Sequence, residues 1–139
     1  AIILRAELTR SHSSVTIKKA SSNHLLKRKG SLYMMKKCRL TILKTTLQED
    51  LAKEYGVPGL SRCPLMQEGQ VFYADYAKPD GFCDEAWKAI YQYVFALANG
   101  ADGWYFDDWI DTARHRGVAI CSCNDGLRPV IIKVERIEE

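Results

Sequence analysis

Cysteines are the residues of this sequence best suited to chemistry. Thiolates are nucleophiles and soft ligands for zinc, copper(I) or iron–sulfur clusters. The sequence separations between successive cysteines are 25, 20, 38 and 2 residues, so the C-x-x-C spacing that makes a metal site a strong prediction is missing. The chain contains five of them: Cys38, Cys63, Cys83, Cys121 and Cys123.

Two interpretations of these thiols stay open. In the first, Cys63, Cys83 and Cys123 converge on one site, where they are candidate ligands of a thiolate-bound metal or members of a redox-active set. In the second, all the thiols are buried and bind no cofactor, because cysteine is among the most buried residue types and packs as a small hydrophobe. The second interpretation is the leading expectation.

A local arrangement singles out Cys123. Asp125 and Gly126 suit a two-residue hairpin turn, and that turn would place Cys123 opposite Arg128. A guanidinium beside a thiol favours the reactive thiolate form. Cys123, Arg128 and Asp125 are therefore the candidate catalytic residues. The competing interpretation is that Arg128 pairs with Asp125 and braces the hairpin.

An acidic and aromatic segment supplies two further candidates. Asp107, Asp111 and His115 are spaced four residues apart and would share a face if the segment were helical, where they suit a divalent metal. The alternative is a solvated turn in which neighbouring arginines offset the acids. The aromatic residues of the segment favour a protein partner or a homo-oligomer, because large exposed apolar groups mark interaction sites. They are Trp104, Tyr105, Phe106 and Trp109.

The elements that would position these side chains begin with a strand and a short helix. Residues 38–45 alternate between apolar and polar types, which predicts a half-buried strand. Thr46 and Glu49 have the spacing of a capping box, which predicts that a helix begins there. Leu47, Leu51 and Tyr55 repeat at helical spacing, and the glycine and proline that follow end the helix.

A longer helix is expected between residues 84 and 98. Asp84 is expected to cap its N-terminus, and Asn99 and Gly100 are expected to end it. Apolar residues recur along it at the spacing of one helical face, which predicts that this face forms the core. They are Trp87, Ile90, Tyr91, Val94, Phe95 and Ala98.

Three more strands complete the expected fold. Residues 70–76, 117–123 and 129–137 have strand character, and Pro129 predicts an edge or a bulge because proline cannot donate to a ladder. The order β-α-β-α-β-β predicts an α+β fold with a small mixed or mainly antiparallel sheet, one long core helix and one short helix.

Charge divides the chain into two regions. Residues 1–37 hold nine of the 20 basic side chains but one of the 17 acidic ones, whereas the remainder is acidic. We therefore expect residues 1–34 to be a basic leader outside a single domain that spans residues 35–139. By this balance the body is not a nucleic-acid binder.

Hydropathy and cysteine usage bear on the compartment. The sequence has no apolar run long enough to span a bilayer and no secretory signal at its start. Free thiols suit a reducing compartment. The expectation is a cytoplasmic protein without a membrane anchor.

Four separated segments resemble one family of proteins. They are CRLTILKTTLQEDLAKEYG, CPLMQEGQVF, KPDGFCDEAWKAIYQYVFALANG and NDGLRPVIIKVERI. Together they are similar to a family of short proteins, common in anaerobic bacteria and archaea, that has no established activity. The pair Cys121 and Cys123 departs from the adjacent cysteines of similar proteins. By resemblance, the positions of interest are Cys63, Gly69, Gly81, Cys83, Trp87, Cys123, Asp125, Gly126, Arg128 and Pro129.

Two functions are compatible with these observations. The first is a structural or interaction domain that associates with itself or with a protein partner. The second is a thiol-dependent metal-linked or redox-linked binding protein or enzyme of anaerobic metabolism. The first predicts scattered and buried thiols, and the second predicts sulfurs that converge on one pocket.

Overall fold

The computed structural model describes residues 25–28, 31–34, 36–101 and 109–137. Along the chain, the elements are β1 (Leu25–Arg28), β2 (Ser31–Met34), β3 (Cys38–Thr45), α1 (Glu49–Tyr55), β4 (Val71–Ala74), α2 (Asp84–Ala98), β5 (Val118–Ser122) and β6 (Val130–Arg136).

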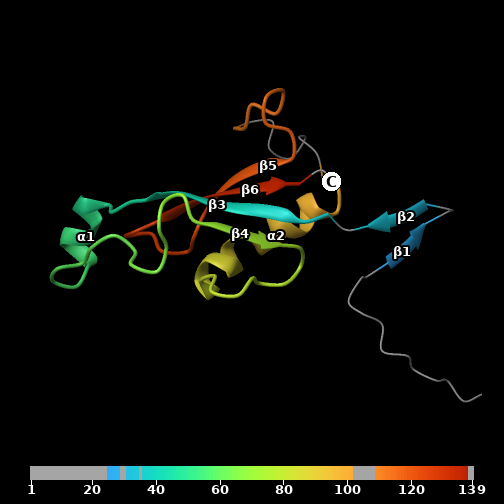
Figure 1. Cartoon of the computed structure of the whole chain (residues 1–139). Coiled ribbons are helices and arrows are strands. Elements are labelled where there is room, and N and C mark those ends of the chain that lie inside the picture. Colours follow the sequence, from blue (N-terminus) through green and yellow to red (C-terminus); the bar gives the residue numbers. More distant parts are fainter. Residues whose placement is uncertain (1–24, 29–30, 35, 102–108, 138–139) are drawn as a thin grey trace, which may run out of the picture.

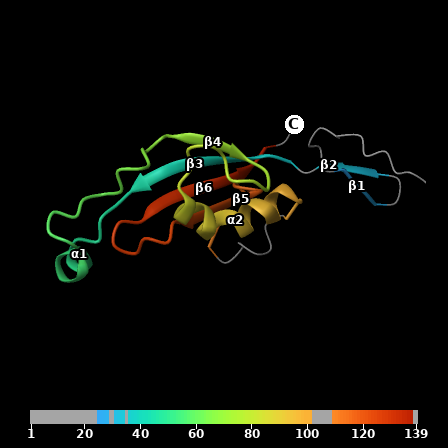
Figure 2. The same ribbon diagram turned by 90° about the horizontal axis from the view of Figure 1, so that it is seen from below.

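The body of the protein is a four-stranded antiparallel sheet with α2 on one face. The strand order is β4-β3-β6-β5, and each neighbouring pair is antiparallel. Figures 1 and 2 show α2 lying across this sheet, while α1 lies beyond one end of the strands. The α+β prediction is confirmed, and the sheet is antiparallel throughout.

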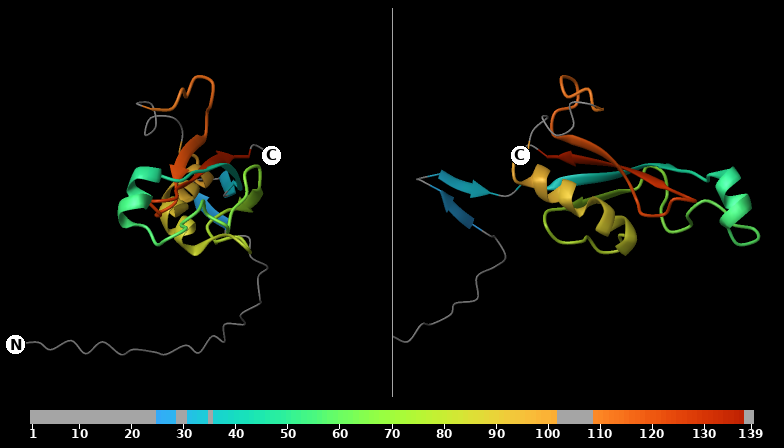
Figure 3. Two further views of the ribbon diagram at one scale, coloured as in Figure 1. Left: turned by 90° about the vertical axis from the view of Figure 1, so that its left-hand side faces the viewer. Right: turned by 180° about the vertical axis from the view of Figure 1, so that it is seen from behind.

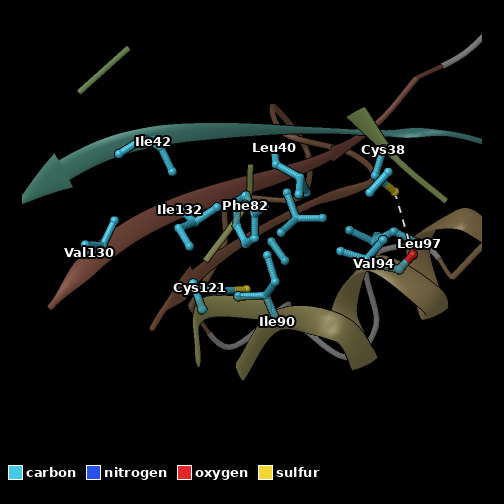
Figure 4. Packing of buried hydrophobic residues seen from close by; sticks show 14 of the residues in the cluster. Cys38, Leu40, Ile42, Phe82, Ile90, Val94, Leu97, Cys121, Val130 and Ile132 are labelled. Atoms are coloured by element: carbon cyan, nitrogen blue, oxygen red, sulfur yellow. Dashed lines mark hydrogen bonds between the residues drawn. The ribbon is translucent and has the colours of Figure 1, made fainter. Parts of the chain in front are cut away.

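The hydrophobic core lies between the sheet and α2. Alternate residues of β3 and β6 point toward the helix, as the period of two in a strand requires. Ile90, Val94 and Leu97 of α2 meet them with no exposed surface. In Figure 4 these helical side chains face Leu40 and Ile132 of the sheet.

The inward face of α2 differs from the predicted one. Ala86, Ile90, Val94, Leu97 and Ala98 are its buried residues. The aromatic residues at positions 87, 91 and 95 form a stripe along the flank of the helix, with ring centroids 5.6 Å apart in the first pair and 6.0 Å in the second. Trp87 is partly buried and packs against the core, as predicted. Tyr91 and Phe95 are 40% and 47% exposed, so the prediction that they belong to the core is wrong.

The predicted capping box at the start of α1 does not form. The helix begins at Glu49 with Gln48 as its N-cap, and no side chain caps it. The Thr46 hydroxyl instead donates to the carbonyl oxygen of Pro129 at 3.0 Å. Leu51 and Tyr55 are exposed, since α1 has no buried residue and does not pack on the sheet.

Pro129 does not mark a sheet edge. It immediately precedes β6, which is an interior strand between β3 and β5. A proline is tolerated there because the ladder begins only after it. The bulge of the sheet lies elsewhere, in β3, where the β3–β6 register shifts between Ile42 and Lys44.

Strands β1 and β2 pair only with each other among the described strands. Leu25 lies opposite Met34 in this separate two-stranded sheet, which is visible beside the body in Figure 3. The hairpin falls within the segment expected to be a leader, so part of that segment has regular structure. The boundary near residue 35 stays a prediction.

No helix in the described part of the chain has the length and apolar character needed to cross a lipid bilayer.

Candidate functional site

A pocket of about 260 Å³ opens beside the first turn of α2. Three segments that are distant in sequence form its wall: the loop before β4, the start of α2, and the connection between β5 and β6. The lining residues are Cys63, Leu65, Met66, Cys83, Glu85, Ala86, Cys123, Asn124, Asp125, Arg128 and Val130. The three cysteines predicted to converge therefore line a single pocket, together with both other candidate residues.

The loop from residue 56 to residue 70 brings Cys63 to the pocket. At its end, Gly69 and Gln70 hydrogen-bond with the backbone of Ile42 in β3. Gly69 adopts a φ of +83°, a conformation that glycine reaches without steric cost. Met66 is buried and anchors the middle of the loop in the core, which leaves Cys63 half-buried at the pocket wall.

The connection before α2 positions Cys83. The neighbouring Phe82 is buried and makes an edge-to-face contact with Phe72 of β4 at 5.0 Å between ring centroids. Cys83 is the N-cap of α2, so the prediction that Asp84 caps this helix is wrong: Asp84 is its first residue. The Cys83 carbonyl oxygen accepts the first helical hydrogen bond, from Trp87 at 2.9 Å. Its half-buried thiol thus lies at the start of the core helix.

Cys123 continues the pairing of β5 with β6. Its backbone N–H donates to the carbonyl oxygen of Val130 at 3.1 Å. The N–H of Val130 donates in turn to the Cys123 Sγ at 3.3 Å. A backbone donor thus points at the sulfur, and this contact would strengthen with negative charge on the thiol.

Asp125 organises the connection between β5 and β6. Its Oδ1 accepts hydrogen bonds from the backbone N–H groups of Leu127 at 3.0 Å and Arg128 at 3.1 Å. Its Oδ2 accepts from Nε of Arg128 at 2.8 Å. One carboxylate thereby fixes both the backbone of the turn and the guanidinium, so the interpretation in which Asp125 pairs with Arg128 is confirmed.

The hairpin register predicted for this connection is wrong. Cys123 lies opposite Val130 and not opposite Arg128, since the pairing of Ser122 with Ile131 continues by one step. Gly126 does not adopt a left-handed conformation, so a two-residue turn does not form. The Asp125 side chain satisfies the backbone of a longer connection, as aspartate commonly does in turns.

Two cations lie close to the pocket thiols. The hydrogen bond to Asp125 raises the pKa of Arg128, and the thiols of Cys63 and Cys123 act in the same direction. Similarly, the salt bridge to Glu85 raises the pKa of Lys88, with a smaller contribution from Cys83. Arg128 therefore interacts with two thiols and Lys88 with the third.

The remaining thiols belong to the core. Burial raises the pKa of Cys38 to about 11 and that of Cys121 to about 12. The Cys38 thiol also donates a weak hydrogen bond to the carbonyl oxygen of Val94 at 3.7 Å. The interpretation of cysteine as a buried hydrophobe thus holds for these two residues, and the other three differ from them.

The predicted metal sites are not preformed. Among residues 36–101 and 109–137, no three His, Cys, Asp or Glu side chains are grouped closely enough to hold an ion. Cys63, Cys83 and Cys123 line the same pocket without forming such a group. A metal held by these thiols would therefore require their side chains to move.

The second predicted metal site also fails to appear. Asp107 lies outside the described residues. Asp111 and His115 are exposed and belong to a turn in which the His115 N–H donates to the Asp111 carbonyl oxygen at 2.9 Å. The Asp111 carboxylate pairs with Nε of Arg114 at 3.1 Å. The solvated turn is the arrangement found for these described residues.

The proposed aromatic contact is described only in part. Trp104, Tyr105 and Phe106 lie outside the described residues. Trp109 is 58% exposed. The described aromatic contacts run from the core along α2, and their exposed end is formed by Tyr91 and Phe95.

Some pocket residues were not foreseen. Met66 adds a fourth sulfur to the lining. Asn124 connects two walls of the pocket, because its Nδ2 donates a hydrogen bond to the Glu85 carbonyl oxygen at 3.2 Å. Met66 follows Cys63 by three residues, so its closeness in sequence to a candidate site residue could have indicated it. The contact between Asn124 and Glu85 spans 39 residues and has no counterpart in the sequence pattern.

Comparisons with protein-family models, with curated proteins and with solved structures find no match for this chain. Membership of the family of short proteins common in anaerobic bacteria and archaea stays a prediction.

Proposed function

We propose that this domain is a thiol-dependent binding protein and that the pocket beside α2 is its binding site. One observation carries the proposal: Cys63, Cys83 and Cys123, which come from three distant segments, all line that pocket. Convergence of the sulfurs is what distinguishes this function from a purely structural role with scattered thiols.

The contrast with the other two cysteines supports this assignment. Cys38 and Cys121 are buried in the core, whereas each pocket thiol is partly exposed and free. Packing alone gives no reason for three half-buried thiols to share one wall with two cations nearby. Five free thiols also suit a reducing, cytoplasmic compartment.

The dimensions of the pocket suggest a small ligand. Its volume of about 260 Å³ lies just below the range of small-molecule sites, about 300 to 1,000 Å³. Leu65, Met66, Ala86 and Val130 offer apolar contact, and the charged groups offer orientation. A compact thiol-reactive molecule fits this combination. A role in anaerobic metabolism rests on the family resemblance alone.

Native-state alkylation tests the proposal. The reduced chain is treated with iodoacetamide, and the modified positions are identified by peptide mass mapping. We expect Cys63, Cys83 and Cys123 to be modified in the folded protein, and Cys38 and Cys121 only after unfolding in urea. Protection of all the pocket thiols in the folded protein would contradict the proposed function.

The aromatic stripe on α2 favours a second candidate function, that of an interaction domain. The rings of Trp87, Tyr91 and Phe95 follow one another along the helix. Tyr91 is 40% exposed and Phe95 is 47% exposed. Self-association through this stripe predicts a dimer in sedimentation experiments. The Phe95→Glu variant should then be monomeric, and a monomeric parent chain would dismiss this candidate.

A further inference from the structure

Cys123 has two neighbours that favour negative charge on its sulfur. The backbone N–H of Val130 points at Sγ from 3.3 Å, and the guanidinium of Arg128 lines the same pocket. Both groups can interact favourably with the negative charge of a thiolate, the nucleophilic form, while it attacks. Among the hydrogen bonds described for the pocket cysteines, the bond from Val130 is the one in which a sulfur is the acceptor.

Cys63 shares the environment of Cys123. Arg128 interacts electrostatically with both thiols, whereas Cys83 interacts with Lys88 across the helix start. Cys63, Cys123 and the guanidinium of Arg128 thus line one pocket, and Arg128 is the cation that interacts with both of these thiols. Asp125 fixes this guanidinium through its 2.8 Å salt bridge.

We propose that the pocket exchanges with small disulfides, with Cys123 as the attacking thiol and Cys63 as the resolving thiol. This inference rests on the proposed function, because it requires the pocket thiols to be accessible. The substrate class is a low-molecular-weight disulfide. The pocket, of about 260 Å³, has room for the two sulfur atoms of such a molecule and the groups next to them.

The reaction consists of two successive thiol–disulfide exchange steps. In the first, the Cys123 thiolate attacks one sulfur of the disulfide; a bond from Sγ to that sulfur forms, the disulfide bond breaks, and the other sulfur leaves as a thiolate that takes a proton from water. In the second, Cys63 loses its proton to water and its thiolate attacks Sγ of Cys123; the bond from Sγ to the substrate sulfur breaks, and that sulfur leaves as a thiolate that takes a proton from water. The substrate is reduced to two thiols, and the protein gains a disulfide between Cys63 and Cys123.

Arg128 and Asp125 are positioning residues in this scheme. The guanidinium stabilises the thiolate before attack, and the Asp125 carboxylate holds it in place while limiting its net charge. Arg128→Met should therefore slow the first step several-fold. Arg128→Lys should retain most of the rate, since it keeps a cation, although it loses the Nε contact to Asp125.

The test uses the full chain in its reduced form with bis(2-hydroxyethyl) disulfide in an anaerobic buffer. Acid-quenched samples are analysed by mass spectrometry and peptide mapping. We expect the first adduct on Cys123, the release of two equivalents of 2-mercaptoethanol per chain, and a final peptide that links Cys63 to Cys123. Cys63→Ser should stop at the mixed disulfide with one equivalent released.

Matched variants give the scheme a sharp control. Cys123→Ser should lower the exchange rate at least tenfold, and Cys121→Ala, which removes a core thiol outside the pocket, should keep the parental rate. A parental rate in Cys123→Ser, a second equivalent released by Cys63→Ser, or a first adduct on Cys63 or Cys83 would overturn the inference. The position of the first adduct is read from the parent chain, so the test stands even if a variant does not fold.

The two proposals fail in different ways. If iodoacetamide modifies the pocket thiols but the disulfide does not exchange, the further inference is wrong and the thiol-dependent pocket stands. If iodoacetamide modifies none of them, the proposed function itself is wrong. Circular dichroism of each variant confirms that its fold is intact before rates are compared.

Discussion

The hydroxyl of Thr46 donates a hydrogen bond to the carbonyl oxygen of Pro129, 83 residues later, at 3.0 Å. The Thr46 N–H donates to the same oxygen at 3.1 Å. These two bonds join the end of β3 to the residue before β6, beside the connection that carries Asp125 and Arg128. A residue expected to cap a helix therefore fastens the sheet next to the pocket.

Replacing Thr46 should weaken the sheet and leave α1 unaffected. Thr46→Val keeps the shape of the side chain and removes the donor, so the free energy of unfolding should fall by about 1 kcal/mol, the net worth of a typical hydrogen bond. Urea unfolding measures the loss. Gln48→Ala, at the actual N-cap, is the control and should change stability by less than about 0.5 kcal/mol, since its side chain makes no cap. A loss in Thr46→Val no larger than that in the control would contradict this role of Thr46.

The two faces of α2 should differ in their contribution to stability. Ile90 has no exposed surface, and truncating such a side chain costs about 2–5 kcal/mol, so Ile90→Ala should be severely destabilised. Phe95 is 47% exposed, and Phe95→Ala should cost much less. The loss of stability in Trp87→Ala should lie between these two values, because the ring is partly buried and its centroid lies 6.3 Å from that of Phe82. Urea melts of the three variants establish the order, and a Phe95→Ala loss equal to that of Ile90→Ala would contradict this orientation of the helix.

The helix bounds could be predicted from the sequence, but its orientation could not. Asp84 to Ala98 was the expected range because the apolar spacing and the terminal Asn99 and Gly100 are local signals. Two apolar stripes run along this helix, however, and each has helical spacing. Only packing against β3 and β6 decides that the stripe with Ile90 turns inward, and no local pattern carries that information.

The face on which Cys123 lies could be predicted from the sequence, but the pocket could not. The predicted turn at Asp125 and Gly126 placed Cys123 opposite Arg128, and the structure pairs it with Val130 instead. The difference is two residues, and side chains on a strand alternate with a period of two. The same face of the strand therefore points inward in both registers. The convergence of Cys63 and Cys83 on Cys123 depends on loops, which the periodicity does not describe.

Acid should weaken the connection that carries Arg128. Partial burial opposes ionisation of Asp125, but the hydrogen bonds from Arg128 and Leu127 outweigh it, and the pKa of Asp125 is lowered from its ordinary value of 3.8. A carboxyl whose pKa is lowered by folding stabilises the folded state above its ordinary pKa, and the contribution is lost as the pH falls through the folded pKa. Asp125→Asn should therefore lower the melting temperature at pH 7, and the difference from the parent should shrink below about pH 4.

Thermal melts of the parent and of Asp125→Asn across this pH range provide the measurement. Asp80→Asn, in an exposed turn, is the matched control and should stay close to the parent at each pH. A difference between the parent and Asp125→Asn that stays constant down to pH 2 would show that the charge of Asp125 does not stabilise the connection.

Alkali should destabilise the fold through the two core thiols. Burial raises the pKa of Cys38 from 9.0 to about 11, although Arg136 acts weakly in the opposite direction, and burial raises that of Cys121 from 9.0 to about 12. Above pH 9 the unfolded chain ionises these thiols while the folded chain keeps their protons. The unfolded state is then favoured, by up to about 1.4 kcal/mol per pH unit for each thiol, until the pH passes the folded pKa.

The unfolding free energy of the parent should therefore fall between pH 9 and pH 11, as measured by urea melts. Other groups titrate in this range, so the slope needs a comparison within the same sheet. Cys121→Ala is less stable at neutral pH but lacks one of the two thiols, and its slope should be shallower than that of the parent. Val134→Ala removes a fully buried apolar side chain from β6 and should keep the parental slope while losing stability at every pH. Equal slopes in the parent and in Cys121→Ala would mean that this thiol does not stay protonated in the core. Native-state alkylation would then modify Cys121 as well, and the separation of core thiols from pocket thiols would no longer hold.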